Sequence, residues 1–184
     1  MPHEPRCVWT LGHSTRPLAE FVALFKSYDI LRLADVRSIP RSRKNPQFNI
    51  DTLPAALAAT GIEYMHFKDL GGLRHPRKDS PNDGWRNASF RGFADHMQTA
   101  IFAHALEGLI QLARLKPTAI MCAEAVPWRC HRSLIADTLT VRGVEVYHIV
   151  SAHKAELHRL TPFARVEETR ITYPFALTGS SQET

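Results

Sequence analysis

The chain has 184 residues, of which 44% are hydrophobic and 22% are charged, and these values are typical of one globular domain. No apolar run approaches the roughly 18 residues that a membrane-spanning helix needs, and the polar start at 1–6 is followed by no apolar segment of the kind found in secretory signals. The three cysteines are too few, and odd in number, for a disulfide scaffold. We therefore expect a cytoplasmic protein with no membrane partner.

The charge balance is basic, with 23 Lys and Arg against 18 Asp and Glu and a net charge of +5. A basic excess favours a partner that carries phosphate or other negative charge. Because the sum says little about distribution, the position of the basic residues along the chain decides how strongly nucleic acid is indicated.

Short apolar runs predict five strands, and apolar residues three or four positions apart predict the helices between them. Ser14 or Thr15 is the expected N-cap of the first helix, with Pro17 in its first turn; Asp51 is the expected cap of the second helix, which Gly61 ends. The predicted strands are 7–11, 30–36, 62–67, 118–122 and 144–150, and the predicted helices are 18–28, 51–60, 93–115 with a break near Gly108, 130–142 and 152–159.

This alternation indicates a single α/β domain over 5–177, with a mostly parallel sheet of about five strands and helices on both faces. The expected architecture is a three-layer one of the Rossmann-like or flavodoxin-like kind. A long polar insert at 68–91 shows no periodicity, and loops of that length in compact domains are usually functional. Residues 178–184 are expected to be a disordered tail.

Polar or ionisable residues follow every predicted strand, in the segments 12–15, 35–38, 68–72, 122–124 and 151–153. Ligands of open parallel sheets bind beyond the carboxyl ends of the strands. We therefore expect these segments to converge on one edge of the sheet and to form the functional site there.

The segment after the fourth strand carries the densest set of reactive groups. Cys122 ends the strand and Glu124 follows it by two residues. Cys130, His131 and Arg132 begin the next helix, whose free N–H groups favour an anion. A carboxylate and an imidazole can divide the roles of acid and base. The alternative is structural: Glu124 pairs with an arginine of the same loop and only holds it in place.

The same segment gives little support for a metal. Cys122, Cys130 and His131 are possible zinc ligands, but a gap of seven residues before an adjacent Cys-His pair is not a standard zinc spacing. We therefore expect neither a metal nor an organic cofactor.

The segment after the second strand, 35–49, is rich in basic residues. Arginine and lysine can contact phosphates, and serines and amides can bind phosphate or base edges, while the single aromatic residue, Phe48, can stack on a base. A solvated basic loop is the alternative interpretation. Basic and aromatic residues also alternate in the 68–91 insert, where Trp85 is expected either to contact a partner or to pack on the domain. His13 lies where a catalytic group or a packed turn residue is equally expected.

Together these segments resemble the domain-of-unknown-function 488 family (DUF488), from residue 11 to about 150. The motifs that carry the resemblance are Leu11-Gly12-His13-Ser14, Asp35-Val36-Arg37-Ser38, Asn45-Pro46-Gln47-Phe48-Asn49, Leu70-Gly71-Gly72, Phe90-Arg91-Gly92-Phe93, Cys122-Ala123-Glu124 and Cys130-His131-Arg132. The resemblance implies a fold and a site, and it implies a link to DNA-base excision for at least some members.

A fainter similarity points to rhodanese-like domains, in which a cysteine heads an anion-binding loop and carries sulfur. Asp35-Val36-Arg37 after a strand is similar to them, as is Cys122 followed by a loop, Arg132-Ser133 and a helix. The loop here contains Pro127 and Trp128 but no glycine, and glycine usually permits the tight convergence of N–H groups that such a loop needs.

The expected function is that of a nucleic-acid-acting hydrolase, a DNA N-glycosylase that flips out and excises a damaged or modified base, with a 5-substituted uracil-type pyrimidine as the best candidate. The expected catalytic residues are Glu124, Asp35, His131 and His13. The residues expected to bind the substrate or nucleic acid are Ser14, Arg37, Ser38, Arg41, Arg43, Lys44, Gln47, Phe48, Asn49, Arg91, Cys122 and Arg132.

Two other classes of function stay open. A cysteine-based sulfur-transfer or redox enzyme needs Cys122 or Cys130 as a reactive thiolate. A non-enzymatic DNA- or RNA-binding module needs only the basic loops.

Overall fold

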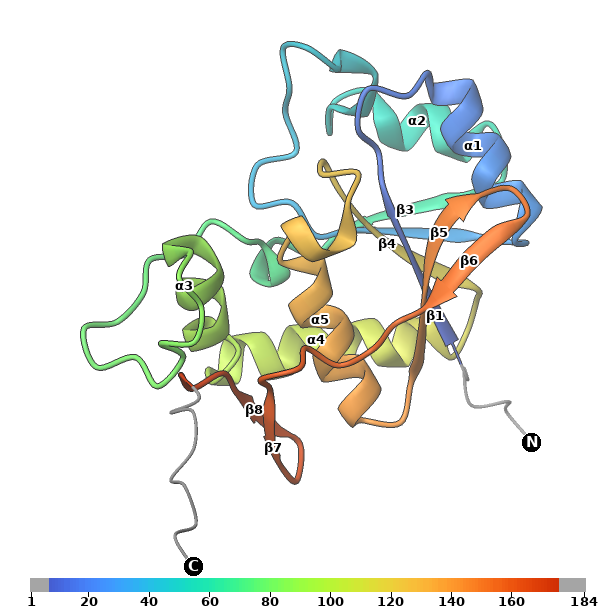
Figure 1. Ribbon diagram of the computed structural model, residues 1–184. Helices are drawn as coiled ribbons and strands as arrows, with labels where there is room; N and C mark the ends of the chain where they lie inside the picture. The colour runs from blue at the N-terminus through green and yellow to red at the C-terminus, as the bar shows by residue number, and fades with distance from the viewer. Residues whose placement is uncertain (1–6, 176–184) are drawn as a thin grey trace, which may run out of the picture.

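The structure is a computed structural model that describes residues 7–175, so the tail expected at 178–184 lies outside the described residues. Its main sheet has six strands in the order β3-β2-β4-β1-β5-β6 (Figure 1). The first five strands of that order are parallel, and β6 is antiparallel to β5. The strands are β1 (Cys7–Gly12), β2 (Arg32–Asp35), β3 (Glu63–His66), β4 (Thr118–Cys122), β5 (Glu145–Ser151) and β6 (Lys154–Leu157). The predicted α/β domain with a mostly parallel sheet is thus confirmed.

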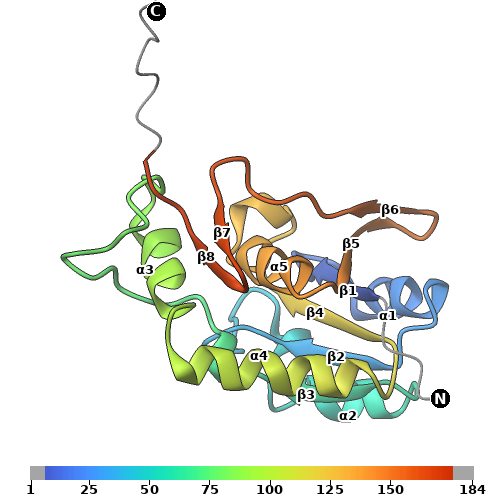
Figure 2. The same ribbon diagram turned by 90° about the horizontal axis from the view of Figure 1, so that it is seen from below.

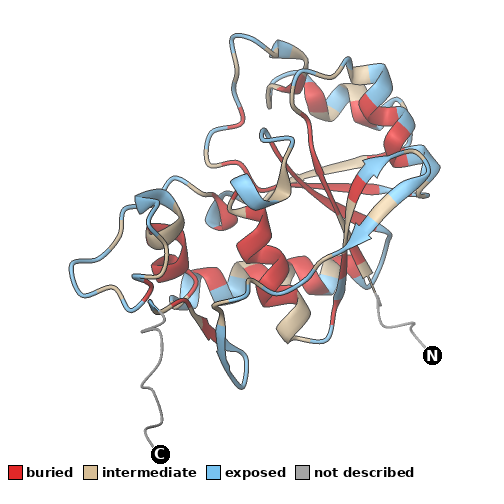
Figure 3. Cartoon of the chain, viewed as in Figure 1, coloured by how far each residue is buried: buried red, intermediate tan, exposed pale blue. Residues whose placement is uncertain are grey.

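Helices cover both faces of the sheet, as Figures 1 and 2 show. The two faces have separate apolar clusters, because neighbouring residues of a strand point to opposite sides. Leu33 and Met121 face α1 (Leu18–Ser27) and α2 (Leu53–Ala58), whereas Ala34 and Ile120 face α4 (Ala100–Ala113) and α5 (Arg132–Val141). The central strands and α5 are almost wholly buried (Figure 3).

The C-terminal part of the chain was predicted wrongly at 152–159. That segment is no helix; β6 pairs with β5 as a hairpin, with Ile149 opposite Ala155 and Tyr147 opposite Leu157. The pairing gives β5 a neighbour on its outer side, where its main-chain groups would otherwise lack hydrogen-bond partners. A second, two-stranded sheet follows, made of β7 (Arg165–Glu167) and β8 (Arg170–Thr172).

Several predicted helix boundaries also moved. The break in 93–115 lies not at Gly108 but between α3 (Ala88–His96) and α4, where the Thr99 hydroxyl caps α4 by accepting from the Phe102 N–H at 3.2 Å. Neither Ser14 nor Thr15 caps α1, which begins after Pro17 with no side-chain cap. Asp51 does not cap α2 either: the N-cap residue is Thr52, and the Asp51 carboxylate pairs with Arg41. Gly61 follows α2 with φ of +82°, as a helix stop requires.

The insert at 68–91 is packed onto the domain. It begins with a short 3-10 helix, Lys68–Leu70, and leads into α3. Trp85 packs against Phe90, Phe163 and Tyr173, with ring centroids 4.8 to 5.5 Å apart, so of its two expected roles the structure has the packed one. No helix in 7–175 has the length and apolar character to cross a membrane.

A buried ion pair fixes the carboxyl end of β2. Asp35 is fully buried, and both of its oxygens accept hydrogen bonds from the Arg37 guanidinium, at 2.9 Å (Nε to Oδ1) and 2.6 Å (Nη2 to Oδ2). Tyr64 of β3 donates its hydroxyl to Asp35 at 2.8 Å, and Arg37 donates to the carbonyl oxygen of Phe48 at 2.7 Å. One charged pair therefore joins two strands and the loop that follows β2.

We expect Arg37→Ala to lower the free energy of unfolding by about 3–5 kcal/mol, because it leaves the Asp35 carboxylate buried and unpaired. The matched control is Arg41→Ala, which removes an exposed ion pair with Asp51 and is expected to cost less than about 1 kcal/mol. Urea unfolding followed by circular dichroism measures both, and equal losses in the two variants would contradict the role given to Arg37.

Candidate active site

Two adjoining cavities lie at the carboxyl edge of the sheet. One has a volume of about 440 Å³ and the other of about 380 Å³, and the side chains of Arg37, Ile39, Ala123 and Glu124 line both. The larger cavity lies between the loop after β4 and the start of α3; the smaller lies between that loop and the turn after β1. The predicted convergence of strand-end segments therefore applies to those after β1, β2, β3 and β4.

Glu124 lies at the junction of the two cavities and is exposed to solvent. The Val126 N–H donates to its Oε1 at 3.2 Å, which orients the carboxylate. The ion pairs found within 7–175 do not include Glu124, so the alternative of an ion pair with Arg129 or Arg132 is not what the structure has. Glu124 is therefore free to meet a ligand.

The loop that carries Glu124 is held by its main chain. Arg132, almost completely buried, donates to the carbonyl oxygens of Glu124 at 3.1 Å and Ala125 at 3.4 Å. Gly12 of β1 packs beneath it, and a Cβ at that position would lie 1.8 Å from the Glu124 carbonyl oxygen, so only glycine allows the close approach. Arg132 thus holds the loop by its main-chain carbonyl oxygens, and it is not among the residues that line the two cavities.

Asp35 does not join Glu124 in one site. Its side chain lies on the α1/α2 face of the sheet with Leu33, whereas Cys122 faces α5. Asp35 is also fully buried and engaged by Arg37 and Tyr64, and it lines neither cavity. In this arrangement Asp35 positions Arg37, which is one of the residues that line both cavities.

His131 lines the larger cavity as a neutral imidazole. Its Nε2–H donates to the carbonyl oxygen of Val36 at 2.9 Å, which leaves Nδ1 as an acceptor 3.4 Å from the Cys130 sulfur. Burial lowers the pKa of His131 from 6.5 to about 4, and Arg132 adds to the effect. The ring is therefore a weak base that supplies no positive charge at neutral pH, and its Nδ1 can accept a hydrogen bond.

His13 is fixed by contacts on every side. Its Nδ1–H donates to the Ser14 carbonyl oxygen at 2.7 Å, Arg37 lies 3.3 Å from its Nε2, and its ring stacks on Phe48 at 4.3 Å. Burial lowers the pKa of His13 to about 4. His13 lines the smaller cavity, but both of its nitrogens already have hydrogen-bond partners, so it acts there as a positioning residue for Arg37.

Two free cysteines lie at the larger cavity. The sulfurs of Cys122 and Cys130 are 2.7 Å apart, and both residues are more than nine-tenths buried. The hydrogen bond from Cys130, together with Arg132, lowers the pKa of Cys122 to about 7, against the effect of burial. The same interaction and burial raise the pKa of Cys130 well above its usual value.

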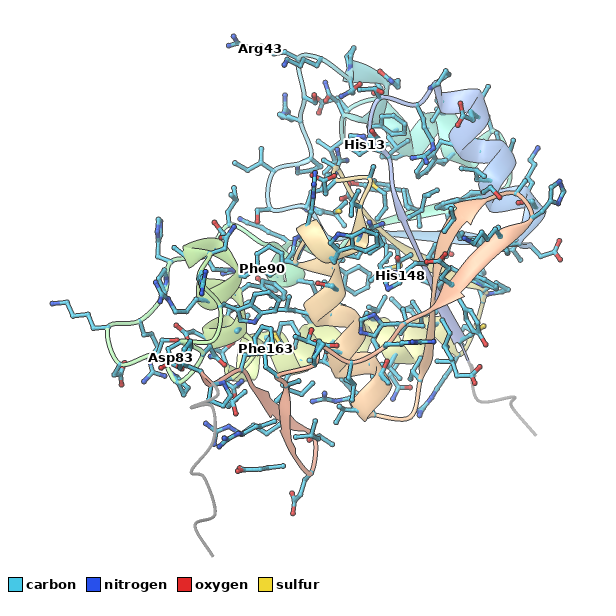
Figure 4. All side chains as sticks on the ribbon, viewed as in Figure 1. His13, Arg43, Asp83, Phe90, His148 and Phe163 are labelled. Atoms are coloured by element: carbon cyan, nitrogen blue, oxygen red, sulfur yellow. The ribbon has the colours of Figure 1, made fainter. Side chains whose placement is uncertain are left out.

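The basic loop after β2 divides into an exposed tip and a packed return. Arg41, Arg43 and Lys44 are exposed, and Figure 4 shows Arg43 extending away from the sheet. The return is structural: Gln47 donates to the Arg16 carbonyl oxygen, and Asn49 accepts from the Ser42 N–H. Phe48 is fully buried in the core beside α1, so its side chain is not placed to stack on a base.

The remaining predicted binding residues differ in their position relative to the two cavities. Ser38 lines it and accepts from the Leu73 N–H at 2.9 Å, and Ser14 lines the smaller cavity with φ of +50°. Arg91 is on α3, yet the residues of that helix start that line the cavity are Asn87, Ser89 and Phe90. Figure 4 places Phe90 between α3 and α5.

Several residues that line the larger cavity were not among the site residues predicted from the sequence, and they include Asn87, Ser89, Phe90 and Arg129. Asn87 and Phe90 were noted as part of the insert in which basic and aromatic residues alternate. The signal that could have found the first three is Asn87 as a helix N-cap residue, since Asn87 caps α3 by accepting from the N–H groups of Ser89 and Phe90. Among the residues at 7–175, no group of three or more Cys, His, Asp or Glu is arranged to hold a metal ion.

Because the pKa of His131 is lower in the folded protein than in the unfolded chain, protonation favours unfolding. Its contribution is complete above about pH 6.5 and is lost as the pH falls to about 4. Between pH 7 and pH 4 the parent protein should lose more of its free energy of unfolding than His131→Gln does. The difference between the two losses should be about 3 kcal/mol at most. Urea titrations at both pH values measure this, with His104→Gln, at an exposed position of α4, as the control; identical pH dependence in all three proteins would contradict a neutral His131.

A family model matches residues 17–139, which is about two thirds of the chain and includes β2 to β4 and most of α5. The matched range contains Arg37, Glu124, Cys130 and His131, and thus most of the site just described. No curated protein and no solved structure matches the chain. The chain therefore belongs to DUF488, the family described as a domain of unknown function.

Proposed function

We propose that the protein is a DNA N-glycosylase that excises a damaged or modified base, with a 5-substituted uracil-type pyrimidine as the best candidate. The observation that carries the proposal is the exposed Glu124 carboxylate at the junction of two cavities. The larger cavity, of about 440 Å³, is within the range of small-molecule sites and is large enough for one nucleobase taken out of the stack.

Cleavage of an N-glycosidic bond develops positive charge on the sugar and negative charge on the departing base. A single carboxylate beside the sugar can stabilise the cation or activate the attacking water, as carboxylates do in sugar hydrolysis generally. Glu124 has the required freedom, because the hydrogen bond from Val126 orients it without neutralising it.

The departing base needs hydrogen-bond donors in the other part of the cavity. His131 is neutral and its Nε2–H is already used, so it does not stabilise the anion as an imidazolium. Arg129, Asn87 and Ser89 line the same cavity and carry donors, and we assign them this role. Arg132 acts through the loop that it supports.

The exposed tip of the loop after β2 supplies the contacts to the DNA backbone. Arg41 lines the smaller cavity, and Arg43 and Lys44 are exposed residues of the same loop. Charges at such a position neutralise phosphates whatever the sequence of the DNA, and they hold the strand while one base leaves the stack.

We expect Glu124→Gln to keep DNA affinity within a few-fold and to lose base release by about two orders of magnitude, or roughly 3 kcal/mol of transition-state stabilisation. The amide keeps the shape and removes the charge. Single-turnover assays on oligonucleotides that each carry one modified base measure the formation of abasic sites, and a binding titration uses the same oligonucleotide. Glu107→Gln, at an exposed position of α4, is the control.

Full activity in Glu124→Gln would contradict the carboxylate mechanism at this residue. If Cys130→Ala were inactive while Glu124→Gln stayed active, the thiol alternative would replace it. Binding to DNA with no base release from any modified oligonucleotide would favour the non-enzymatic module.

We further expect the triple variant Arg41→Ala, Arg43→Ala, Lys44→Ala to bind every DNA sequence more weakly. The slope of log affinity against log salt concentration should flatten by about 0.9 for each phosphate that the variant no longer neutralises. Fluorescence anisotropy over a range of salt concentrations measures the slope.

The matched control for the basic loop is the double variant Lys26→Ala, Arg114→Ala. Both residues are exposed. Lys26 lies in the last turn of α1 and Arg114 directly follows α4, so both lie toward the opposite edge of the sheet. The control should leave the slope unchanged. A triple variant with the slope of the parent protein would count against DNA as the partner.

A further inference from the structure

The cysteine pair at the larger cavity has a geometry that the proposed glycosylase chemistry does not use. The sulfurs of Cys122 and Cys130 are 2.7 Å apart, whereas a disulfide bond requires about 2.05 Å. Cys122 ends β4 and Cys130 precedes α5, so a shift of under about 1 Å in the side chains would join two elements that are already packed together.

The surroundings favour a thiolate at this place. Arg132 is 1% exposed, and no carboxylate of 7–175 forms an ion pair with it; its Nε has no hydrogen-bond partner among the described residues. A buried guanidinium without a counter-ion is unfavourable, so negative charge on a nearby sulfur stabilises both groups. The main-chain N–H of Arg132 also donates to the Cys130 sulfur at 3.5 Å.

A hydrogen-bond acceptor for the Cys130 thiol and an access route are present as well. His131 has its Nδ1 at 3.4 Å from the Cys130 sulfur, and the hydrogen bond from its Nε2–H to Val36 leaves that nitrogen unprotonated. Cys122 and Cys130 both line the cavity of about 440 Å³, through which a small reagent can reach them.

We propose that Cys122 and Cys130 form a reversible dithiol–disulfide centre at the larger cavity, with a low-molecular-weight disulfide as its oxidant. The Cys122 thiolate attacks one sulfur of the oxidant, forms a mixed disulfide and releases one thiolate. The Cys130 thiol then attacks the Cys122 sulfur. The bond between Cys122 and the oxidant breaks, the departing thiolate takes up the Cys130 proton, and the intramolecular disulfide closes. The protein loses two hydrogen atoms, and the oxidant leaves as two thiols.

The third cysteine provides an internal comparison. Cys7 is half-buried at the start of β1, at the opposite edge of the sheet, and burial and Glu145 raise the pKa of its thiol. Among the residues at 7–175, no sulfur forms a hydrogen bond with Cys7 and no positive charge lowers the pKa of its thiol, so we expect Cys7 to stay reduced under conditions that oxidise the other two.

The test uses the whole folded chain in buffers with defined ratios of reduced to oxidised glutathione. Free thiols are trapped by rapid alkylation and counted by intact mass, and the linked peptides are mapped after proteolysis. We expect the count to fall from three to one, with Cys7 free and with a Cys122–Cys130 link that dithiothreitol reverses. Cys7→Ser should lose the same two thiols, and Cys130→Ser should stop at a glutathione adduct on Cys122.

The proposal is overturned if all three thiols persist at ratios that oxidise a small free dithiol. It is also overturned if glutathione adducts accumulate on Cys122 of the parent protein without a link to Cys130, or if the link forms only after unfolding in urea. Peptide mapping of the parent decides the matter even if a serine variant fails to fold. Because no DNA is involved, the outcome is independent of the proposed base excision.

Discussion

The ion pair between Asp35 and Arg37 is the constraint on which the site depends. A buried carboxylate is tolerable only when it is paired and hydrogen-bonded, and here the partner, Arg37, belongs to the loop that leaves the same strand. The remaining donors of Arg37 reach the Phe48 carbonyl oxygen and the His13 ring, while its own carbonyl oxygen lies 2.8 Å from Nε2 of His66 on β3. One residue thereby sets the relative positions of the segments that follow β1, β2 and β3.

The fourth segment, after β4, is fixed in a different way. Arg132 holds it by the carbonyl oxygens, and Gly12 allows β1 to approach it closely. Neither contact engages the Glu124 side chain, so the structure restrains the main chain of the loop and leaves the carboxylate open to solvent. A reactive side chain that is open to a ligand, on a main chain that is held in place, is the arrangement that fixes a functional group relative to a bound molecule.

The sequence was sufficient to predict the parallel sheet and the edge where the site lies, because strand ends of parallel sheets converge by geometry alone. The position of Phe48 was not predictable. Its neighbours are polar and basic, but the short 3-10 helix Pro46–Phe48 turns its ring inward onto His13. A helix of three residues has no periodicity to read. The β5–β6 hairpin was missed for a related reason: the segment 152–159 is short, and tertiary pairing with β5 overrode its local pattern.

The separation of the two carboxylates has a chemical consequence. Asp35 ends β2, and Glu124 follows the end of β4. Side chains alternate along a strand, so Asp35 lies on the α1/α2 face of the sheet, whereas Cys122, the last residue of β4, lies on the α5 face. Since Asp35 is paired with Arg37 and lines neither cavity, the two groups do not form the paired acid and base of sugar hydrolases. A hydrolase at this site must work with one carboxylate, and that suits a leaving group that departs as a stabilised anion. A nucleobase held by neighbouring hydrogen-bond donors is such a leaving group, whereas a sugar alkoxide would need a second acid to protonate it.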